Sequence, residues 1–162
     1  MRKAIGIRIE TATDKDTARL TQLYRKLYKG DEDQRFFKSN AVANYFKSGS
    51  RVFVARDGNC IEGFIWVVYY EHIKNKGIGI IEELYIDDKY RKKGIGKRLV
   101  SKAIEYLKKR DVLVVIVTTS PHMINAKRFY KAVGFKVSRE WFYYSLYRGE
   151  RKKVPHTGNS KM

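Results

Sequence analysis

The residues with the clearest chemical potential form a basic, glycine-containing run near the middle of the sequence. Its members are Arg91, Lys92, Lys93, Gly94, Ile95, Gly96 and Lys97. Glycines lack a Cβ and let the backbone approach a bound group closely. The first N–H groups of a helix have no intrahelical partner, and the helix dipole favours an anion beside them. If this run opens a helix, it therefore forms a cradle for a diphosphate.

The apolar pattern around this run places it between a strand and a helix. Residues 78–86 predict a strand, and apolar residues then recur at every fourth position from Ile95 to Leu107, as on one face of a helix. Residues 112–118 are an unbroken apolar run, which is typical of a strand buried on both faces. A strand, a helix and a second strand in this order predict one crossover and a parallel pair.

Other elements are expected on both sides of this unit. Before it we expect a strand near residues 5–9, helices over 14–29 and about 34–48, and antiparallel strands over 51–56 and 60–71. After it we expect a helix that ends at Gly134 and a strand-like segment over 135–147. Residues 149–162 lack periodicity and are expected to form a basic tail.

Composition narrows the class of protein. The 162 residues carry a formal net charge of +18, from 35 Lys and Arg against 17 Asp and Glu, and such an excess favours an anionic partner. No apolar run reaches the about 20 residues that span a bilayer, and the first ten residues lack the apolar core of a secretory signal. We therefore expect a cytoplasmic protein that does not insert into a membrane.

Two motifs resemble those of the GNAT superfamily of acetyl-CoA-dependent N-acetyltransferases. The first is Arg91-x-x-Gly94-x-Gly96, and the second, about 35 residues later, is Phe129-Tyr130-x-x-x-Gly134-Phe135. The resemblance implies a mixed α/β fold (α+β), with helices on both faces of a twisted, largely antiparallel sheet. That sheet would have about six or seven strands and one central parallel pair. It also implies a single domain over residues 1–148.

The same resemblance implies a way of binding coenzyme A. In this superfamily the glycine loop, residues 91–97 here, binds the pyrophosphate through backbone amides. The strand before it pairs with the pantetheine arm, and this maps to Leu84, Tyr85 and Ile86. That strand and the next one, residues 112–118, separate after a bulge, and the thioester lies between them. Acetyl-CoA is thus the implied cosubstrate.

Three residues are candidates for the chemistry, which is attack of a free amine on a thioester carbonyl. A carboxylate can take the proton that the amine must lose. Glu82 matches the glutamate base of some members, and Glu83 is the second candidate, since successive strand residues point to opposite faces. Tyr130 matches the tyrosine that stabilises or protonates the leaving thiolate. Alternatively, the glutamates are surface carboxylates and Tyr130 is a core aromatic.

Some features depart from the family pattern or leave the acceptor open. In many members an asparagine seven residues before the tyrosine binds the cofactor arm, and here that position is Met123. The acidic run Asp31–Asp33 suggests a cationic amine acceptor such as a polyamine, an aminoglycoside or a basic peptide, with Glu71, Glu82 and Glu83 as possible contributors to its site. Alternatively, this run only favours the start of the next helix. The three histidines and Cys60 lack the spacing of metal ligands, so we expect no metal.

A function of a different class also fits the charge. From residue 89 to residue 110, ten Lys and Arg stand against one acid, Glu105. A basic module that binds nucleic acid or a ribosome on a GNAT-like scaffold is therefore the alternative to an N-acetyltransferase. The two hypotheses differ in salt dependence, because nucleic-acid affinity falls steeply with salt. We expect a monomer or a homodimer.

Overall fold

The computed structural model describes residues 6–29, 41–47, 50–71, 77–120 and 122–137. These residues fall into two compact units that divide after Thr118. The first unit holds a sheet with its flanking helices, and the second holds the helix α4 (Ile124–Ala132). The expected strand-like segment beyond residue 137, the domain boundary after residue 148 and the basic tail lie outside the described residues.

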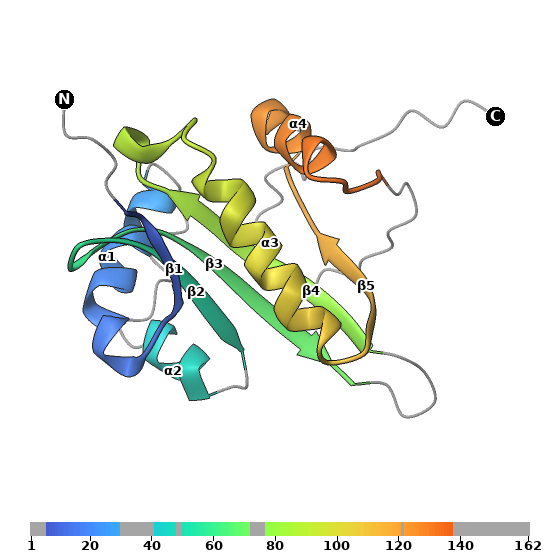
Figure 1. Ribbon diagram of the computed structural model, residues 1–162, viewed down its shortest axis with the longest axis horizontal. Coiled ribbons are helices and arrows are strands. Elements are labelled where there is room, and N and C mark those ends of the chain that lie inside the picture. Colours follow the sequence, from blue (N-terminus) through green and yellow to red (C-terminus); the bar gives the residue numbers. More distant parts are fainter. Residues whose placement is uncertain (1–5, 30–40, 48–49, 72–76, 121, 138–162) are drawn as a thin grey trace, which may run out of the picture. The chain divides into compact units, whose positions relative to one another are not determined.

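The sheet of the first unit has five strands in the order of the chain (Figure 1). They are β1 (Arg8–Thr11), β2 (Arg51–Asp57), β3 (Cys60–Tyr70), β4 (Gly77–Ile86) and β5 (Val112–Val117). Strands β1 to β4 pair in antiparallel fashion, and β5 runs parallel to β4. The antiparallel meander and the parallel pair that the sequence predicts are thereby confirmed, with the pair at one end of the described strand order.

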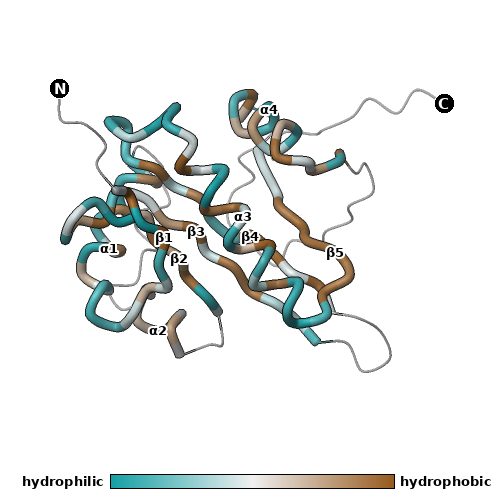
Figure 2. The backbone as a smooth tube through the Cα atoms, viewed as in Figure 1, coloured by the Kyte–Doolittle hydropathy of each residue, from teal (hydrophilic) through white to brown (hydrophobic). Residues whose placement is uncertain are grey.

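Helices cover both faces of this sheet. The helices α1 (Thr17–Leu27) and α2 (Ala41–Lys47) lie on one face, where Leu20, Leu23 and Val42 pack with Val54 and Trp66 in one buried cluster. Helix α3 (Ile95–Lys108) lies on the other face, where Tyr106 contacts Phe53 with ring centroids 5.5 Å apart (Figure 1). Because Phe53 and Val54 are neighbours in β2, they point to opposite faces. In Figure 2 the strands carry many residues in the brown colour of hydrophobic side chains, as expected for a sheet covered on both faces.

Two expected elements differ from the structure in detail. The helix expected over 14–29 begins with a 3-10 turn, η1 (Asp14–Asp16), and the Thr13 N–H donates to the Asp16 carboxylate at 2.9 Å. The expectation that residues 112–118 are buried on both faces is wrong, since Leu113 is 71% exposed and Val114 is 45% exposed. Within the described sheet β5 has a neighbour on one side only, so an apolar run alone did not reveal its exposure.

The close approach of β3 to the end of β4 depends on a glycine. Gly63 pairs with Ile86, and a Cβ at Gly63 would lie 2.7 Å from the Ile86 Cδ1 and 2.9 Å from the Tyr85 carbonyl oxygen. A backbone oxygen inside the sheet cannot move away without breaking the pairing between the strands. Gly63 thus fixes how tightly the end of β4 is held.

We expect Gly63→Ala to lower the free energy of unfolding by about 1–3 kcal/mol, because the new methyl group overlaps backbone. The matched control is Gly79→Ala, where the nearest atom, at 2.7 Å, is the end of the flexible Leu107 side chain. Denaturant unfolding of both variants measures the effect. Equal losses in the two variants would contradict the role given to the Tyr85 carbonyl.

Candidate functional site

The most informative feature of the first unit is a β-bulge in β4. Trp66 of β3 pairs with Glu83, whereas the next residue, Val67, pairs with Ile81. Glu82 is therefore one residue more than β3 can match. A bulge of this kind bends its strand and redirects the side chains beside it.

The bulge coincides with the end of pairing between β4 and β5. The last paired residues are Ile81 and Val117, so β5 accompanies β4 up to the bulge and no further. Beyond it, Leu84, Tyr85 and Ile86 pair with β3 on one side only within the described residues. Backbone groups on the other edge of this segment are free of strand partners, which is what an extended ligand needs in order to add to a sheet.

The two glutamates at the bulge have different surroundings. Glu82 is exposed and has no hydrogen bond or ion pair with a described residue. Glu83 is half-buried, and the Tyr28 hydroxyl at the end of α1 donates a hydrogen bond to its Oε1. The alternation of side chains along a strand could not predict which glutamate faces Tyr28, because the bulge interrupts the regular pleat at Glu82.

Burial alters the ionisation of Glu83 and Tyr28. The pKa of Glu83 lies above its usual value, mainly because burial disfavours the charged carboxylate, and the charge of Glu82 adds to the rise. The hydrogen bond from Tyr28 acts against this rise. Burial and the nearby carboxylate also raise the pKa of the Tyr28 phenol. At neutral pH the phenol therefore keeps its proton and remains a donor to Glu83.

The glycine-containing run lies at the start of α3, where the spacing of apolar residues predicts a helix start. Gly94 is the N-cap with a φ of +75°, a left-handed conformation that glycine adopts without strain. A Cβ at Gly94 would meet no atom within 4 Å, so the space beside it is open. Within the described residues no side chain caps this helix, and its first turn contains no acidic residue. The first amides of α3 and its positive dipole end can therefore face an anion.

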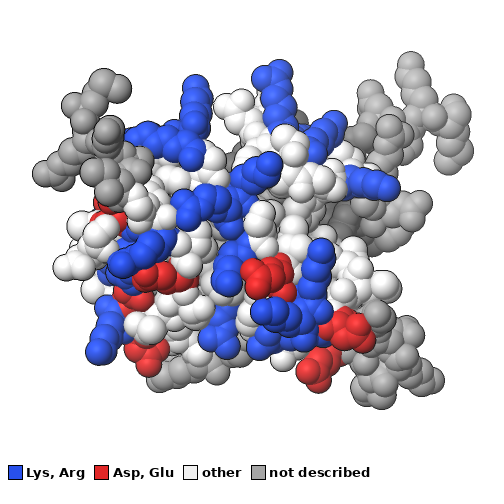
Figure 3. Space-filling view, viewed as in Figure 1, with Lys and Arg blue, Asp and Glu red and all other residues white. Residues whose placement is uncertain are grey.

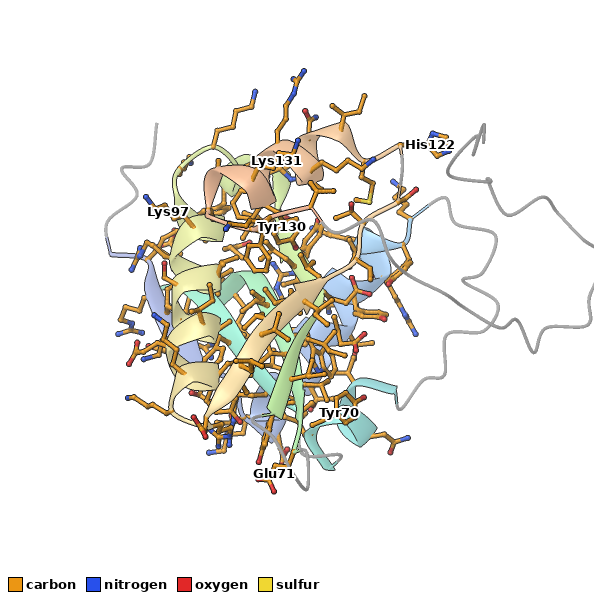
Figure 4. All side chains as sticks on the ribbon, turned by 90° about the vertical axis from the view of Figure 1, so that its right-hand side faces the viewer. Tyr70, Glu71, Lys97, His122, Tyr130 and Lys131 are labelled. Carbon is orange, nitrogen blue, oxygen red and sulfur yellow. The ribbon has the colours of Figure 1, made fainter. Side chains whose placement is uncertain are left out.

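Basic side chains around the cradle divide into two groups. Lys92, Lys93 and Lys97 are exposed, and Lys97 projects outward from the first turn of α3 (Figure 4). Arg91 instead holds the loop: its Nε donates to the Ile86 carbonyl at 3.0 Å, and its guanidinium also pairs with an aspartate. The lysines thus carry most of the uncommitted positive charge beside the helix start. Figure 3 shows further Lys and Arg side chains over α3.

Two further contacts fix the loop between β4 and α3. The Lys26 Nζ of α1 donates to the Asp87 Oδ2 at 2.7 Å, and Asp87 is only 9% exposed. The Tyr90 hydroxyl donates to Asp57, the last residue of β2, at 3.0 Å. These contacts join the cradle loop to α1 and to the sheet. No sequence motif predicts these two contacts, because the two residues of each contact lie more than 30 positions apart along the chain.

Tyr130 belongs to the second unit. It lies on α4, and its ring contacts Phe129 and Phe135 with centroids 5.2 Å and 5.5 Å apart. The Phe135 N–H also donates to the Tyr130 carbonyl at 2.9 Å. These contacts explain why an aromatic pair precedes Gly134 and Phe135. After α4 ends, the chain folds back so that Phe135 packs against Tyr130. The Tyr130 side chain is labelled in Figure 4.

The remaining acceptor candidates are placed as follows. Asp31–Asp33 lies outside the described residues. Glu71 follows the end of β3 (Figure 4) and is five residues beyond Trp66, the partner of the bulge. At about 3.3 Å per strand residue it lies about 17 Å along the strand from the bulge. The structure thus brings Glu82, Glu83 and Tyr28 together and leaves Glu71 apart.

The described residues contain no group of three or more His, Cys, Asp and Glu side chains that could hold a metal ion. No helix among them is long and apolar enough to cross a bilayer.

The sequence of this chain is similar to those of known proteins. The sequence profile of the acetyltransferase (GNAT) family matches residues 5–135. An uncharacterized N-acetyltransferase of Methanocaldococcus jannaschii is 30% identical over 138 residues, which is 79% of this chain and 60% of that protein. One of Archaeoglobus fulgidus is 32% identical over 133 residues, which is 75% of this chain and 88% of that protein.

A solved structure has the same fold. It is AAC(6')-Iy in complex with a bisubstrate analog, CoA-S-monomethyl-acetylneamine, and it superimposes with a TM-score of 0.74 at 14% sequence identity. The likeness covers 86% of this chain and 97% of that chain. It confirms the mixed sheet with one parallel pair.

We expect Asp87→Asn to lower the free energy of unfolding at pH 7 by about 1 kcal/mol, because a charge-assisted hydrogen bond to Lys26 is lost. The hydrogen bond from Lys26 is the main reason that the pKa of Asp87 lies below its usual 3.8. A lowered pKa stabilises the fold above the unfolded-state value, and this contribution disappears as the pH falls through the folded-state value.

Denaturant unfolding at pH 7 and near pH 3 measures the effect, and the gap between wild type and Asp87→Asn should be smaller at pH 3 than at pH 7. The matched control is Asp88→Asn, whose side chain is 80% exposed where it pairs with Arg91; it should change stability less. A gap of the same size at both pH values would contradict the prediction.

Proposed function

Because the chain belongs to the acetyltransferase (GNAT) family, we propose that it moves an acetyl group from acetyl-CoA to a primary amine by direct attack in a ternary complex. Family membership confirms the resemblance inferred from the two motifs, and the domain is an acetyl-CoA-dependent acyltransferase. The chain spans 60% and 88% of the two archaeal relatives, so the activity of the whole protein, its amine acceptor and its residue roles belong to the proposal.

The observation that carries the proposal is the end of the pairing between β4 and β5 at the Glu82 bulge, in the strand that leads to the start of α3. The free edge of Leu84, Tyr85 and Ile86 can receive the amide groups of a pantetheine arm. The backbone amides at the start of α3, from Gly94 onward, can bind the pyrophosphate that follows the pantetheine arm. An extended ligand with a diphosphate near one end fits both features in succession along the chain. We propose that Arg91 to Lys97 bind coenzyme A in this way, Arg91 by holding the loop and the lysines by charge.

The reaction forms one bond and breaks another. The lone pair of the amine nitrogen attacks the thioester carbonyl carbon, the new C–N bond forms, and the C–S bond breaks to release the coenzyme A thiolate. The amine must lose a proton, which Glu82 accepts directly or through water. The exposure of Glu82 beside the end of β5 supports this role, since the acceptor must reach it.

The leaving thiolate also needs a partner. We assign this role to the Tyr130 hydroxyl, which would donate a proton to the sulfur as the C–S bond breaks. The assignment rests on the place of Tyr130 in the Phe129-Tyr130 motif and on the ring contacts that fix its side chain on α4. A cytoplasmic location, a monomeric or homodimeric state and the absence of a metal stay predictions.

We expect Gly94→Glu to raise the Kd for acetyl-CoA at least about 100-fold. The added side chain requires a left-handed φ and brings a negative charge to the proposed pyrophosphate position. Calorimetric titration of acetyl-CoA at two salt concentrations, with ADP and a short RNA as competitors, measures this. The control Gly94→Ala has the same backbone strain without the charge and should bind more tightly than Gly94→Glu.

Normal acetyl-CoA affinity in Gly94→Glu would contradict the cradle. Wild-type binding that is weak, is erased by salt and prefers RNA would instead support the nucleic-acid module as the function.

We expect Glu82→Gln and Tyr130→Phe each to lower kcat by about 10²–10⁴-fold while changing the Kd for acetyl-CoA by less than about threefold, because each variant removes a proton-transfer group. Single-turnover acetyl transfer to a panel of amines and to peptides measures the rates. The control is Tyr106→Phe, which removes a hydroxyl that accepts from Arg51 away from the cradle loop and should leave both kcat and the Kd unchanged. Unchanged turnover in Glu82→Gln would remove Glu82 from the chemistry, and in Tyr130→Phe would return that residue to a packing role.

A further inference from the structure

We propose that Glu83, held in place by Tyr28, is a binding group for a second positive charge on the acceptor, so that the preferred acceptor is a diamine or a larger oligoamine. This inference rests on the proposed function, since it concerns the acceptor half of the same site. It assigns a role to a half-buried carboxylate that the mechanism above does not use.

Among the described residues, no positively charged side chain pairs with Glu83. Its only hydrogen bond within the described residues comes from the neutral Tyr28 hydroxyl, and no Lys or Arg of that part of the chain forms an ion pair with it. Lys26, a basic residue in the last turn of α1, is paired with Asp87 at 2.7 Å. A partly buried carboxylate without a cation costs free energy, which a bound cation would recover.

The surroundings of this carboxylate favour an alkylammonium group. The Tyr28 ring lies 5.0 Å from the Tyr24 ring, and both tyrosines are partly exposed. Aromatic faces attract cations and also pack against methylene groups. Tyr28 is moreover the C-cap of α1, so the negative end of that helix dipole points to the same place.

The position of Glu83 relative to Glu82 defines the spacing. Glu82 is the bulged residue and the proposed base, and Glu83 is its immediate neighbour. An acceptor with two amines a few methylenes apart can therefore present one nitrogen to the thioester and the other to Glu83. A monoamine of equal length would leave Glu83 uncompensated.

A matched pair of acceptors tests the inference. One is 1,4-diaminobutane, and the other is 4-aminobutan-1-ol, which has the same chain length but a hydroxyl in place of the second amine. For the wild-type protein we expect kcat/KM to favour the diamine by at least about tenfold, mainly through KM, because one charge-assisted hydrogen bond distinguishes the two. In Glu83→Gln this ratio should fall to about one, with kcat nearly unchanged.

A second variant tests the role of Tyr28. The groups that face the Glu83 carboxylate are the Tyr28 hydroxyl from α1, which lowers its pKa, and the Glu82 charge from β4, which raises it together with burial. In Tyr28→Phe the lowering contribution is lost, so the Glu83 pKa rises and the carboxyl group becomes neutral at a higher pH. As the pH is lowered, Glu83 becomes neutral and the preference for the diamine is lost. We expect this loss to occur at a higher pH in Tyr28→Phe than in wild type.

The control is Tyr106→Phe on α3, which removes a hydroxyl that bonds to Arg51 on the other face of the sheet. It should keep both the preference and its pH dependence. The inference is overturned if wild type does not prefer the diamine, if Glu83→Gln keeps the preference, or if the diamine is not acetylated. Tight acetyl-CoA binding together with transfer to a peptide amine would leave the proposed function intact in those cases, whereas loss of acetyl-CoA binding would contradict the proposed function itself.

Discussion

The arrangement of the first unit depends on one extra residue in one strand. Glu82 has no partner in β3, so β4 bends there, and its pairing with β5 ends at the residue before it. Antiparallel pairing with β3 continues on the other side of β4, which keeps the segment from Leu84 to Ile86 straight and anchored. A sheet that loses one neighbour but keeps the other offers an open edge without a loose strand, and such an edge can bind an extended ligand.

Contacts around the bulge hold α1 against β4 at two points. Tyr28 reaches Glu83 and Lys26 reaches Asp87, so the last turn of one helix spans the segment between the bulge and the cradle loop. The two contacts differ in character, because Lys26 and Asp87 neutralise each other whereas Tyr28 leaves the charge of Glu83 in place. The Lys26–Asp87 contact fixes the loop. The Tyr28–Glu83 contact holds a carboxylate that has no ion pair with a described residue beside the proposed acetyl position.

Positive and negative side chains lie at different parts of the candidate site. Lysines beside the start of α3 and an unobstructed helix dipole favour an anion, while the bulge has two carboxylates in a chain with a net charge of +18. A reaction between an anionic cofactor and a cationic amine needs both signs of potential close together. The local arrangement of charge is therefore more informative about function than its sum.

Local patterns in the sequence predict the elements and the glycine run at a helix start. Four-residue spacing from Ile95 to Leu107, with Gly94 and Gly96 at the start, defines α3, and such spacing is a local property of consecutive residues. Tertiary contacts are different: the partial burial of Glu83, its hydrogen bond from Tyr28, the donation from Arg98 to the Ile7 carbonyl at 2.7 Å and the exposure of Leu113 appear only in the folded chain. A bulge is a mismatch between two strands and a buried pair joins distant segments, so neither exists until the chain has folded.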